Sequence, residues 1–575
     1  MTDHRPWFAS YPEGVPHTVE PLPEKSLFST LEDTVGKFSD RPALAWFGKH
    51  LSYRELLGEV ERFSAALVSL GVTKDDRVGL ILPNCPQYVI AYYATIRIGA
   101  VIVGNNPLYT QRELTHQLSD AGIEVVVVLD QLYANVAAVR DQVGLREVVV
   151  CGLEDYMPFP KNILAPLLVF RKNAKKEGHP WPPVPAGAKV RRWKELMRKA
   201  GTVPPVAQVD ATNDVAGFIY TGGTTGLSKG AMLTHSNLVS NGLQATAWFP
   251  GIRPGEDSIM AVIPFFHSYG MTVAMNLAIQ NGLKLCMLPR FELDLTLKEI
   301  QKEKPTLFPG VPRLYIAINE GKETPQFDLS SIRYCLSGAA PLPLAVAEKF
   351  EKITGSRVVE GYGLTETSPI THANPLEGKR KEGSIGLPVP DTDCRLVDLD
   401  DPTREVEPGH EGELAVSGPQ VMKGYWNRDE ETAAMIREDA GGTRWLHTGD
   451  VAKVDEEGFF FIVDRKKDMI LVSGFNVYPT DIEQVLYRHP KIEKVCVVGV
   501  PDKTTGEAVK AFVVLRHGEQ ATTDEIIGWS RENLTGYRVP KQIEFRDALP
   551  ETLVGKVLRR VLLEEEKQKA ALSSS

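Results

Sequence analysis

The feature that most constrains the fold is the alternation of short, continuously apolar runs with stretches of helical length. One helical stretch covers residues 86–98, and the strand-like runs around it are RVGLILP (77–83), AVIVG (100–104), EVVVVLD (124–130) and REVVVCG (146–152). A strand that is apolar at every position is buried on both faces, which is typical of parallel sheets covered by helices. We therefore predict an α/β fold in which parallel-rich sheets are sandwiched with helices.

The C-terminal part of the chain has a different pattern of strand-like and helical stretches. It contains two strand-like runs and one helical stretch, KVCVVGV (494–500), VKAFVVL (509–515) and residues 523–534. The 108 residues that follow Lys467 are enough for a small domain with its own core. We predict a large domain over 1–464, a hinge over 465–467 and a small, mobile α+β domain over 468–575.

The overall composition is that of a soluble globular protein. A net charge of −9, with 43% hydrophobic and 24% charged residues, argues against disordered, collagen-like and coiled-coil chains. The negative sign also argues against a protein that coats nucleic acid. The six cysteines form no C-x-x-C pair, and the N-terminus lacks an apolar signal-peptide region. These features predict reduced thiols and a cytoplasmic location.

One segment carries a charge opposite to that of the rest. Residues 161–199 hold eleven Lys or Arg and two Glu, a net charge of +9, which leaves −18 on the other 536 residues. They lie within a Pro- and Gly-rich stretch, 157–206, that we interpret as an insertion. The apolar run ILAPLLVF (163–170) lies inside it. Two interpretations stay open, namely a solvated basic loop and a peripheral contact with anionic lipid on the inner face of the cell membrane.

The most informative motif is the glycine-rich segment YTGGTTGLSKG (220–230), which follows the apolar run VAGFIY (215–220). Glycines let the backbone turn tightly and aim several N–H groups at one point. Four hydroxyls and Lys229 add further donors and a positive charge. This combination suits a triphosphate, because converging dipoles and cations stabilise an anion.

Three other interpretations of this segment compete with phosphate binding. A Walker A loop requires Gly-Lys-Ser/Thr, but Ser228 precedes Lys229 here. The run Gly226 to Gly230 does satisfy G-x-S-x-G, so a hydrolase nucleophile elbow with Ser228 as nucleophile remains an alternative. A plain glycine-rich turn would not need four hydroxyls and a lysine within a few residues.

At this loop the sequence resembles the adenylate-forming (AMP-binding) superfamily of acyl-CoA synthetases. Six further motifs follow in the order of that family, namely PFFHSYG (264–270), SGAAP (337–341), EGYGLTE (360–366), WLHTGD (445–450), DRKKD (464–468) and PETLVGK (550–556). The resemblance covers residues 40–560. It is strongest to bacterial long-chain fatty acid–CoA ligases, through LVSGFNVYP (471–479) and NNPLYTQREL (105–114).

The resemblance implies ATP-dependent activation of a long-chain fatty acid to acyl-CoA through an acyl-adenylate, with release of pyrophosphate and AMP. It also implies Mg²⁺ held by Thr221 and Glu366, with ATP and CoA as substrates. The implied catalytic residues are Lys556, Glu366, His267 and Thr221. The implied ATP-binding residues are Thr221, Gly222, Gly223, Thr224, Thr225, Gly226, Ser228, Lys229, Gly338, Glu360, Gly361, Tyr362, Thr365, Glu366, Asp450, Arg465 and Lys556.

Individual roles follow from the same resemblance. Tyr362 would stack on adenine and Asp450 would accept hydrogen bonds from the ribose. Lys556 would reach from the small domain to bridge the carboxylate and the α-phosphate, and His267 would position the substrate. Lys467 would be the hinge about which the small domain rotates before CoA attacks. Near Lys556 the family often has Lys and Ser or Thr where this chain has Glu551 and Val554.

Some alternatives stay open at this point. Medium-chain or other carboxylic acids would use the same chemistry, and Met271, Val273, Met275 and Leu277 fit a protein core as well as an acyl tunnel. A serine esterase and a lipid-associated scaffold without activity are the remaining classes. The partners that we expect are fatty acid, ATP and CoA, and no nucleic acid. A homodimer and an anionic membrane facing residues 161–199 are further partners to be tested.

Overall fold

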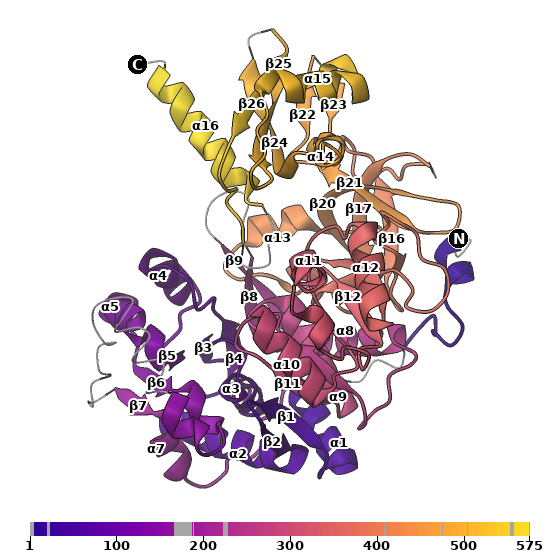
Figure 1. Ribbon diagram of the computed structural model, residues 1–575. Coiled ribbons are helices and arrows are strands. Elements are labelled where there is room, and N and C mark those ends of the chain that lie inside the picture. The colour runs from indigo at the N-terminus through magenta and orange to yellow at the C-terminus, as the bar shows by residue number, and fades with distance from the viewer. Residues whose placement is uncertain are drawn as a thin grey trace.

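The chain forms a large N-terminal domain of sheets and helices and a smaller C-terminal domain (Figure 1). The computed structural model describes residues 5–19, 24–165, 184, 187, 189–221, 228–407, 409–473, 475–502, 504–552 and 557–573. Figure 1 shows the C-terminal elements, from β22 onward, gathered at one end of the large domain. The predicted fold class is confirmed.

An eight-stranded sheet is the largest layer, with the strand order β18-β9-β8-β4-β3-β5-β6-β7. Its strands are β3 (Arg77–Ile81), β4 (Val101–Gly104), β5 (Val125–Leu129), β6 (Glu147–Cys151), β7 (Val190–Arg192), β8 (Val215–Thr221), β9 (Lys229–Thr234) and β18 (Gly424–Tyr425). The pairs from β8 to β7 are parallel, and the β8–β9 and β9–β18 pairs are antiparallel. The apolar runs of the sequence thus become the central parallel strands, as predicted.

Three further sheets complete the large domain, in the orders β10-β11-β1-β2, β12-β13-β14-β15 and β16-β17-β20-β19, with β21 beside β20. The first comprises β1 (Pro42–Trp46), β2 (Lys49–Ser52), β10 (Ser258–Ala261) and β11 (Lys284–Met287). The second comprises β12 (Tyr334–Ser337), β13 (Arg357–Gly363), β14 (Ile370–Ala373) and β15 (Leu387–Pro388). The third comprises β16 (Asp393–Val397), β17 (Gly412–Ser417), β19 (Ile436–Glu438), β20 (Arg444–Val454) and β21 (Phe460–Arg465).

Helices pack around these sheets, and several begin at a residue whose side chain caps them. Ser52, Thr110 and Thr234 each accept a hydrogen bond from a backbone N–H of the first turn, which satisfies a donor that the helix itself leaves unpaired. The helices of the large domain are α1 (Leu27–Phe38), α2 (Tyr53–Ser69), α3 (Pro86–Arg97), α4 (Gln111–Asp120), α5 (Tyr133–Val143), α7 (Trp193–Arg198), α8 (His235–Trp248), α9 (Leu277–Asn281), α10 (Leu293–Glu303), α11 (Pro312–Glu320), α12 (Leu344–Thr354) and α13 (Asp429–Met435).

The small domain has its own sheet, in the order β23-β22-β25-β24 with β26 beside β25. Its elements are β22 (Ile470–Val472), β23 (Phe475–Val477), α14 (Pro479–Tyr487), β24 (Ile492–Asp502), β25 (Gly506–Leu515), α15 (Thr523–Asn533), β26 (Gln542–Phe545) and α16 (Arg559–Ser573). Two hydrophobic clusters draw only on residues of this part, one of them around Ile482 and Val497 and the other around Phe512. The strands and the helix expected here are confirmed by β24, β25 and α15.

Part of the predicted basic insertion belongs to the fold. Strand β7 forms the edge of the eight-stranded sheet, and α7 buries Trp193, whose ring stacks on Phe63 with centroids 4.2 Å apart. Two of its cations form ion pairs with neighbouring acids, Arg191 with Glu147 at 3.1 Å and Lys194 with Asp155 at 3.0 Å. Residues 166–183 lie outside the described part of the chain.

The six cysteines are free thiols, and five of them are buried, in agreement with the expectation from their spacing. No helix in the described ranges combines the length and the apolar character that spanning a bilayer requires.

Candidate active site

The loop after β12 and the end of β13 form one wall of the site. A Cβ atom on Gly338 would lie 3.3 Å from the ring of Tyr269, and one on Gly361 would lie 2.9 Å from the end of the Leu336 side chain, so both positions leave little room for a side chain. The Leu342 N–H donates to Oε2 of Glu360 at 3.1 Å and ties the loop to β13. Burial raises the pKa of Glu360 to about 7.

Three residues predicted to bind the nucleoside are in direct contact. The Tyr362 hydroxyl donates to Oδ2 of Asp450 at 2.5 Å, and Arg465 lies 2.8 Å from Oδ1 of the same carboxylate. The contact between Asp450 and Arg465 follows from the sheet, because Asp450 on β20 is the register partner of Arg465 on β21. Burial and the charge of Asp450 raise the pKa of Tyr362 well above its usual value, so the phenol stays a donor.

Glu366 lies on a short 3-10 turn, η6 (Thr365–Thr367), between β13 and β14. Its carboxylate accepts a hydrogen bond from the Tyr425 hydroxyl at 2.6 Å, and its backbone oxygen accepts one from Met422 N at 2.9 Å. The turn is also held by two hydroxyls, since Ser268 of the 264–270 motif lies 3.3 Å from the Thr365 hydroxyl, and Thr272, two residues beyond that motif, donates to Ser368 O at 2.5 Å. The turn packs against β8 and β9.

The predicted phosphate loop connects β8 and β9. Thr221 ends β8 and pairs with Lys229, which begins β9. Gly222, Gly223, Thr224, Thr225 and Gly226 lie outside the described residues. A strand follows Ser228, whereas a nucleophile elbow leads from a strand directly into a helix. The esterase interpretation of Ser228 therefore lacks the geometry that it requires.

Helix α4 holds both ends of this loop. His116 Nε2 lies 3.0 Å from Ser228 O, and Asp120 accepts the Tyr220 hydroxyl at 2.7 Å. Asp120 also pairs with Arg428 at 2.9 Å. At the start of β9, Lys229 Nζ lies 5.1 Å from the centre of the Tyr425 ring and 3.9 Å from Glu431.

The residue after His267, Ser268, contacts the turn that carries Glu366. Nδ1 of His267 accepts a hydrogen bond from Tyr269 N at 3.2 Å, so the proton of the neutral ring is on Nε2. A stretch of π-helix, η4 (Gly270–Asn276), follows at once, a rare conformation that is frequent at functional sites.

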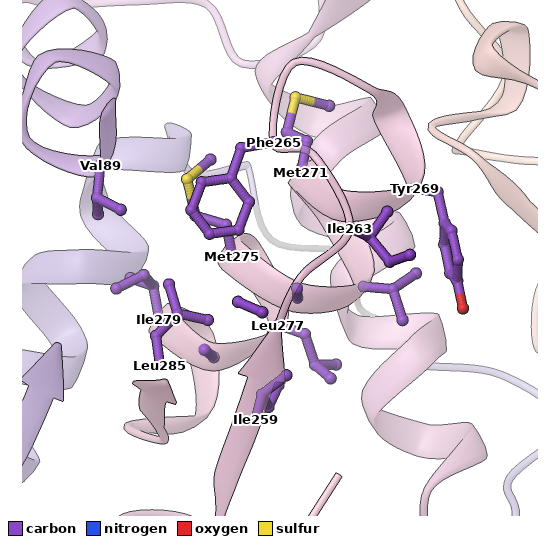
Figure 2. Packing of buried hydrophobic residues seen from close by; sticks show 14 of the residues in the cluster. Val89, Ile259, Ile263, Phe265, Tyr269, Met271, Met275, Leu277, Ile279 and Leu285 are labelled. Carbon is purple, nitrogen blue, oxygen red and sulfur yellow. The ribbon is translucent and has the colours of Figure 1, made fainter. Parts of the chain in front are cut away.

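The side chains of Met271, Val273, Met275 and Leu277 are each at most 2% exposed and belong to the main hydrophobic cluster, part of which Figure 2 shows. Figure 2 shows Met271, Met275 and Leu277 together with Phe265, Ile263 and Tyr269. Their burial fits a core position, and the wall of an acyl tunnel would be buried as well.

The segment that joins the two domains is held by hydrogen bonds on both sides of Lys467. Lys466 N donates to Gly449 O at 2.9 Å, and Asp468 N donates to Arg465 O, also at 2.9 Å. Burial and the charge of Arg465 lower the pKa of Lys467. Asp464 Oδ2 accepts Thr480 N at 2.7 Å, at the first turn of α14.

The last predicted motif is only partly described, because Val554 and Lys556 lie outside the described residues. Glu551, the acid in the place of the family's usual lysine, forms an ion pair with Lys494 on β24 at 2.6 Å. Its charge is therefore matched within the small domain.

The sequence did not point to Tyr425, His116 or Asp120 as site residues. Tyr425 follows a glycine in MKGYWN (422–427), a context in which a tyrosine is usually part of a core. His116 and Asp120 belong to a helix of polar composition. Their contacts with Glu366, Lys229 and the loop depend on pairings between segments far apart in the chain, which a pattern within one segment does not reveal.

Two family models match the chain. The model described as AMP-binding enzyme matches residues 31–426, and the model described as AMP-binding enzyme C-terminal domain matches residues 481–556.

Full-length relatives and solved structures are also similar. A long-chain-fatty-acid–CoA ligase of Bacillus subtilis (strain 168) is 45% identical, covering 98% of this chain and 99% of its own. The crystal structure of ATP-bound MatB from Rhodopseudomonas palustris matches with a TM-score of 0.80 at 30% identity, covering 94% of this chain and 99% of its own. The apo form of the same enzyme matches with a TM-score of 0.70, at the same identity and the same coverage.

Proposed function

This chain belongs to the AMP-binding enzymes, and on that premise we propose that it is an ATP-dependent long-chain fatty acid–CoA ligase. The reaction joins the fatty acid to AMP and then transfers the acyl group to CoA. The observation that carries the proposal is the two sets of polar contacts, that of Tyr425 with Glu366 and that of Tyr362 and Arg465 with Asp450.

The first step needs an activated carboxylate and a stabilised phosphate. The fatty acid carboxylate, ionised at neutral pH, attacks the α-phosphorus of ATP, and pyrophosphate leaves. We assign Asp450 to the ribose hydroxyls, because each carboxylate oxygen keeps a second lone pair after bonding Tyr362 and Arg465. Lys229 and the loop before it would bind the β- and γ-phosphates, and His267 would donate from Nε2 to the reacting oxygens.

The residues present fit Mg²⁺ bound together with the triphosphate. Glu366 offers a buried carboxylate, and Thr221, on a strand that packs against the same turn, offers a hydroxyl. Mg²⁺ commonly takes one or two protein oxygens and completes its shell with phosphate and water, so a larger acidic cluster is not needed. The ion would supply charge neutralisation on the phosphate oxygens.

The second step needs a change in the small domain. We propose that Lys556 serves the adenylation step and that rotation about Lys467 then replaces it with a face that admits CoA, whose thiolate attacks the acyl carbonyl while AMP leaves. The closer match to the ATP-bound than to the apo form of one relative supports an adenylation-type arrangement of the two domains here.

Pyrophosphate release with a panel of acids from C8 to C20, measured with and without CoA, tests the proposal. We expect pyrophosphate release to depend on both acid and ATP, and acyl-CoA to form only when CoA is added. Highest kcat/KM with the longer acids supports the long-chain assignment, and a C8 optimum would replace it with a medium-chain one. Ester cleavage without ATP would contradict the proposal.

Two partners other than the substrates, an anionic membrane and a second copy of the chain, extend the proposal. We propose that the basic insertion meets anionic lipid on the inner face of the cell membrane. Phe159, Ile163 and Leu164 support it, because they are 79%, 56% and 50% exposed beside Lys161. The homodimer stays a prediction that analytical ultracentrifugation can check.

A further inference from the structure

Tyr425 contacts both charged groups that face the proposed triphosphate site. Its hydroxyl donates to Oε1 of Glu366 at 2.6 Å, and its ring lies 5.1 Å from Nζ of Lys229. The residue is 5% exposed, and the Glu366 residue is 8% exposed. One side chain therefore joins the carboxylate of the metal motif to the cation of the phosphate loop.

The backbone around Tyr425 makes the same connection. Residues 422–426 lie between the turn of Glu366 and strand β9, since Met422 N donates to Glu366 O at 2.9 Å and Lys423 N donates to Met232 O at 2.9 Å. Trp426 N closes the run with a bond to Gly230 O at 2.8 Å. Because both ends are fixed, the position of the Tyr425 ring is determined by two separate parts of the site.

The hydroxyl of Tyr425 has one proton and two neighbours. Oε1 of Glu366 lies at 2.6 Å and the sulfur of Met435 at 2.9 Å. A carboxylate is a far stronger acceptor than a thioether, so the proton goes to Glu366.

From these contacts, and on the premise of the proposed function, we infer that Tyr425 is a positioning residue that keeps Lys229 and Glu366 apart. Opposite charges attract each other strongly in a water-poor site, and a direct ion pair between Lys229 and Glu366 would withdraw both from the substrate. The aromatic ring contacts the ammonium group by a cation–π interaction, beside Glu431 at 3.9 Å, and the hydroxyl bonds to the Glu366 carboxylate. Lys229 then stays available for phosphate and Glu366 for the metal ion.

Two substitutions separate the two contacts. Tyr425→Phe removes the hydroxyl and keeps the ring, whereas Tyr425→Leu removes both. Tyr53→Phe is a matched control, because Tyr53 is fully buried in the same domain and its hydroxyl donates to Leu283 O at 2.7 Å, away from the site. Binding of ATP is measured by calorimetry with EDTA, and binding of Mn²⁺ in the presence of ATP by electron paramagnetic resonance.

We expect Tyr425→Phe to weaken Mn²⁺ binding about tenfold while the Kd for metal-free ATP changes less than twofold. Tyr425→Leu is expected to weaken both, and Tyr53→Phe neither. If Tyr425→Phe leaves Mn²⁺ binding unchanged, or weakens Mn²⁺ and metal-free ATP equally, the inference is overturned. A wild-type protein that binds no ATP would overturn the proposed function itself. If the wild type binds ATP normally and only the expected effect of Tyr425→Phe is missing, the inference alone fails.

Discussion

The Tyr362 hydroxyl and the Asp450 carboxylate form a 2.5 Å hydrogen bond between β13 and β20, which belong to different sheets. The same carboxylate holds Arg465, the first residue of the predicted hinge, at 2.8 Å. The proposed ribose acceptor is therefore held by Tyr362, the residue proposed to stack on adenine, and by Arg465 of the predicted hinge.

Tyr362→Phe tests this arrangement. The variant keeps the ring that would stack on adenine and removes one of the two groups that orient Asp450. We expect the Kd for ATP to rise about tenfold, as is usual when a hydrogen bond to a charged group is lost. Tyr362→Leu should raise it further. Calorimetry of ATP binding measures both, and an unchanged Kd for Tyr362→Phe would show that only the ring matters.

Lys467→Pro tests the hinge. The neighbouring backbone bonds, from Lys466 N to Gly449 O and from Asp468 N to Arg465 O, do not use the Lys467 N–H. Proline fixes φ near −65° and restricts Lys466 as well, so the chain is expected to keep one arrangement. We expect ATP–pyrophosphate exchange to persist and thioester formation to fall at least tenfold. Lys467→Ala is the control, and full CoA transfer by the proline variant would argue against a hinge here.

Lys556→Ala tests the proposed adenylation lysine. We expect fatty-acid-dependent ATP–pyrophosphate exchange to fall by about three orders of magnitude, because one preorganised cation at a developing charge commonly contributes that much. Thioester formation from supplied acyl-adenylate should stay largely intact. Glu551→Gln is the matched control, since Glu551 is already neutralised by Lys494 and its loss leaves Lys556 in place. Equal loss of both half-reactions would remove the assigned role.

The sequence predicted the central sheet, and it pointed to the residues of the candidate site, because both depend on local signals. Val125 to Leu129 form a buried parallel strand as their unbroken apolar run indicates, and Asp450 and Tyr362 belong to motifs with a fixed order. Tyr425 could not be predicted in this way. Its role depends on the pairing of β18 with β9 and on the hydrogen bond from Met422 to Glu366, which join residues up to about two hundred positions apart. Such pairings are set by packing of the whole domain.

The pKa of Glu360 gives a pH dependence with a definite sign. Burial raises this pKa from 4.5 to about 7, so the folded state binds more protons than the unfolded state between these values. The free energy of unfolding therefore decreases as the pH rises from about 4.5 to 7. Glu360→Gln keeps an acceptor for Leu342 N and cannot ionise. We expect it to be more stable than wild type by about 1–3 kcal/mol at pH 8 and equal to it at pH 4.5. Urea denaturation at the two pH values measures the difference, and an equal shift at both would contradict the assignment.

The basic insertion yields a prediction about membranes. Lys161, Lys189 and Lys199 lie in the +9 segment, and Phe159 and Ile163 expose apolar side chains next to Lys161. Each lysine near an anionic surface contributes about 1 kcal/mol, and apolar side chains add anchorage that salt does not screen. Replacing the three lysines by Gln should weaken binding to anionic vesicles at least tenfold, and raising the salt concentration should weaken wild-type binding.

The apolar part of this contact needs its own variant and control. Phe159→Ser with Ile163→Ser should lower the binding that remains at high salt, where charge attraction is screened within about 3 Å at 1 M. Replacing Lys322, Lys349 and Lys352, which are exposed elsewhere on the large domain, by Gln changes the net charge equally. Co-sedimentation with phosphatidylserine vesicles and with phosphatidylcholine vesicles measures all of these proteins. If the control triple variant loses as much binding as the insertion variant, the attraction reflects only the net charge, and residues 161–199 are not a membrane contact.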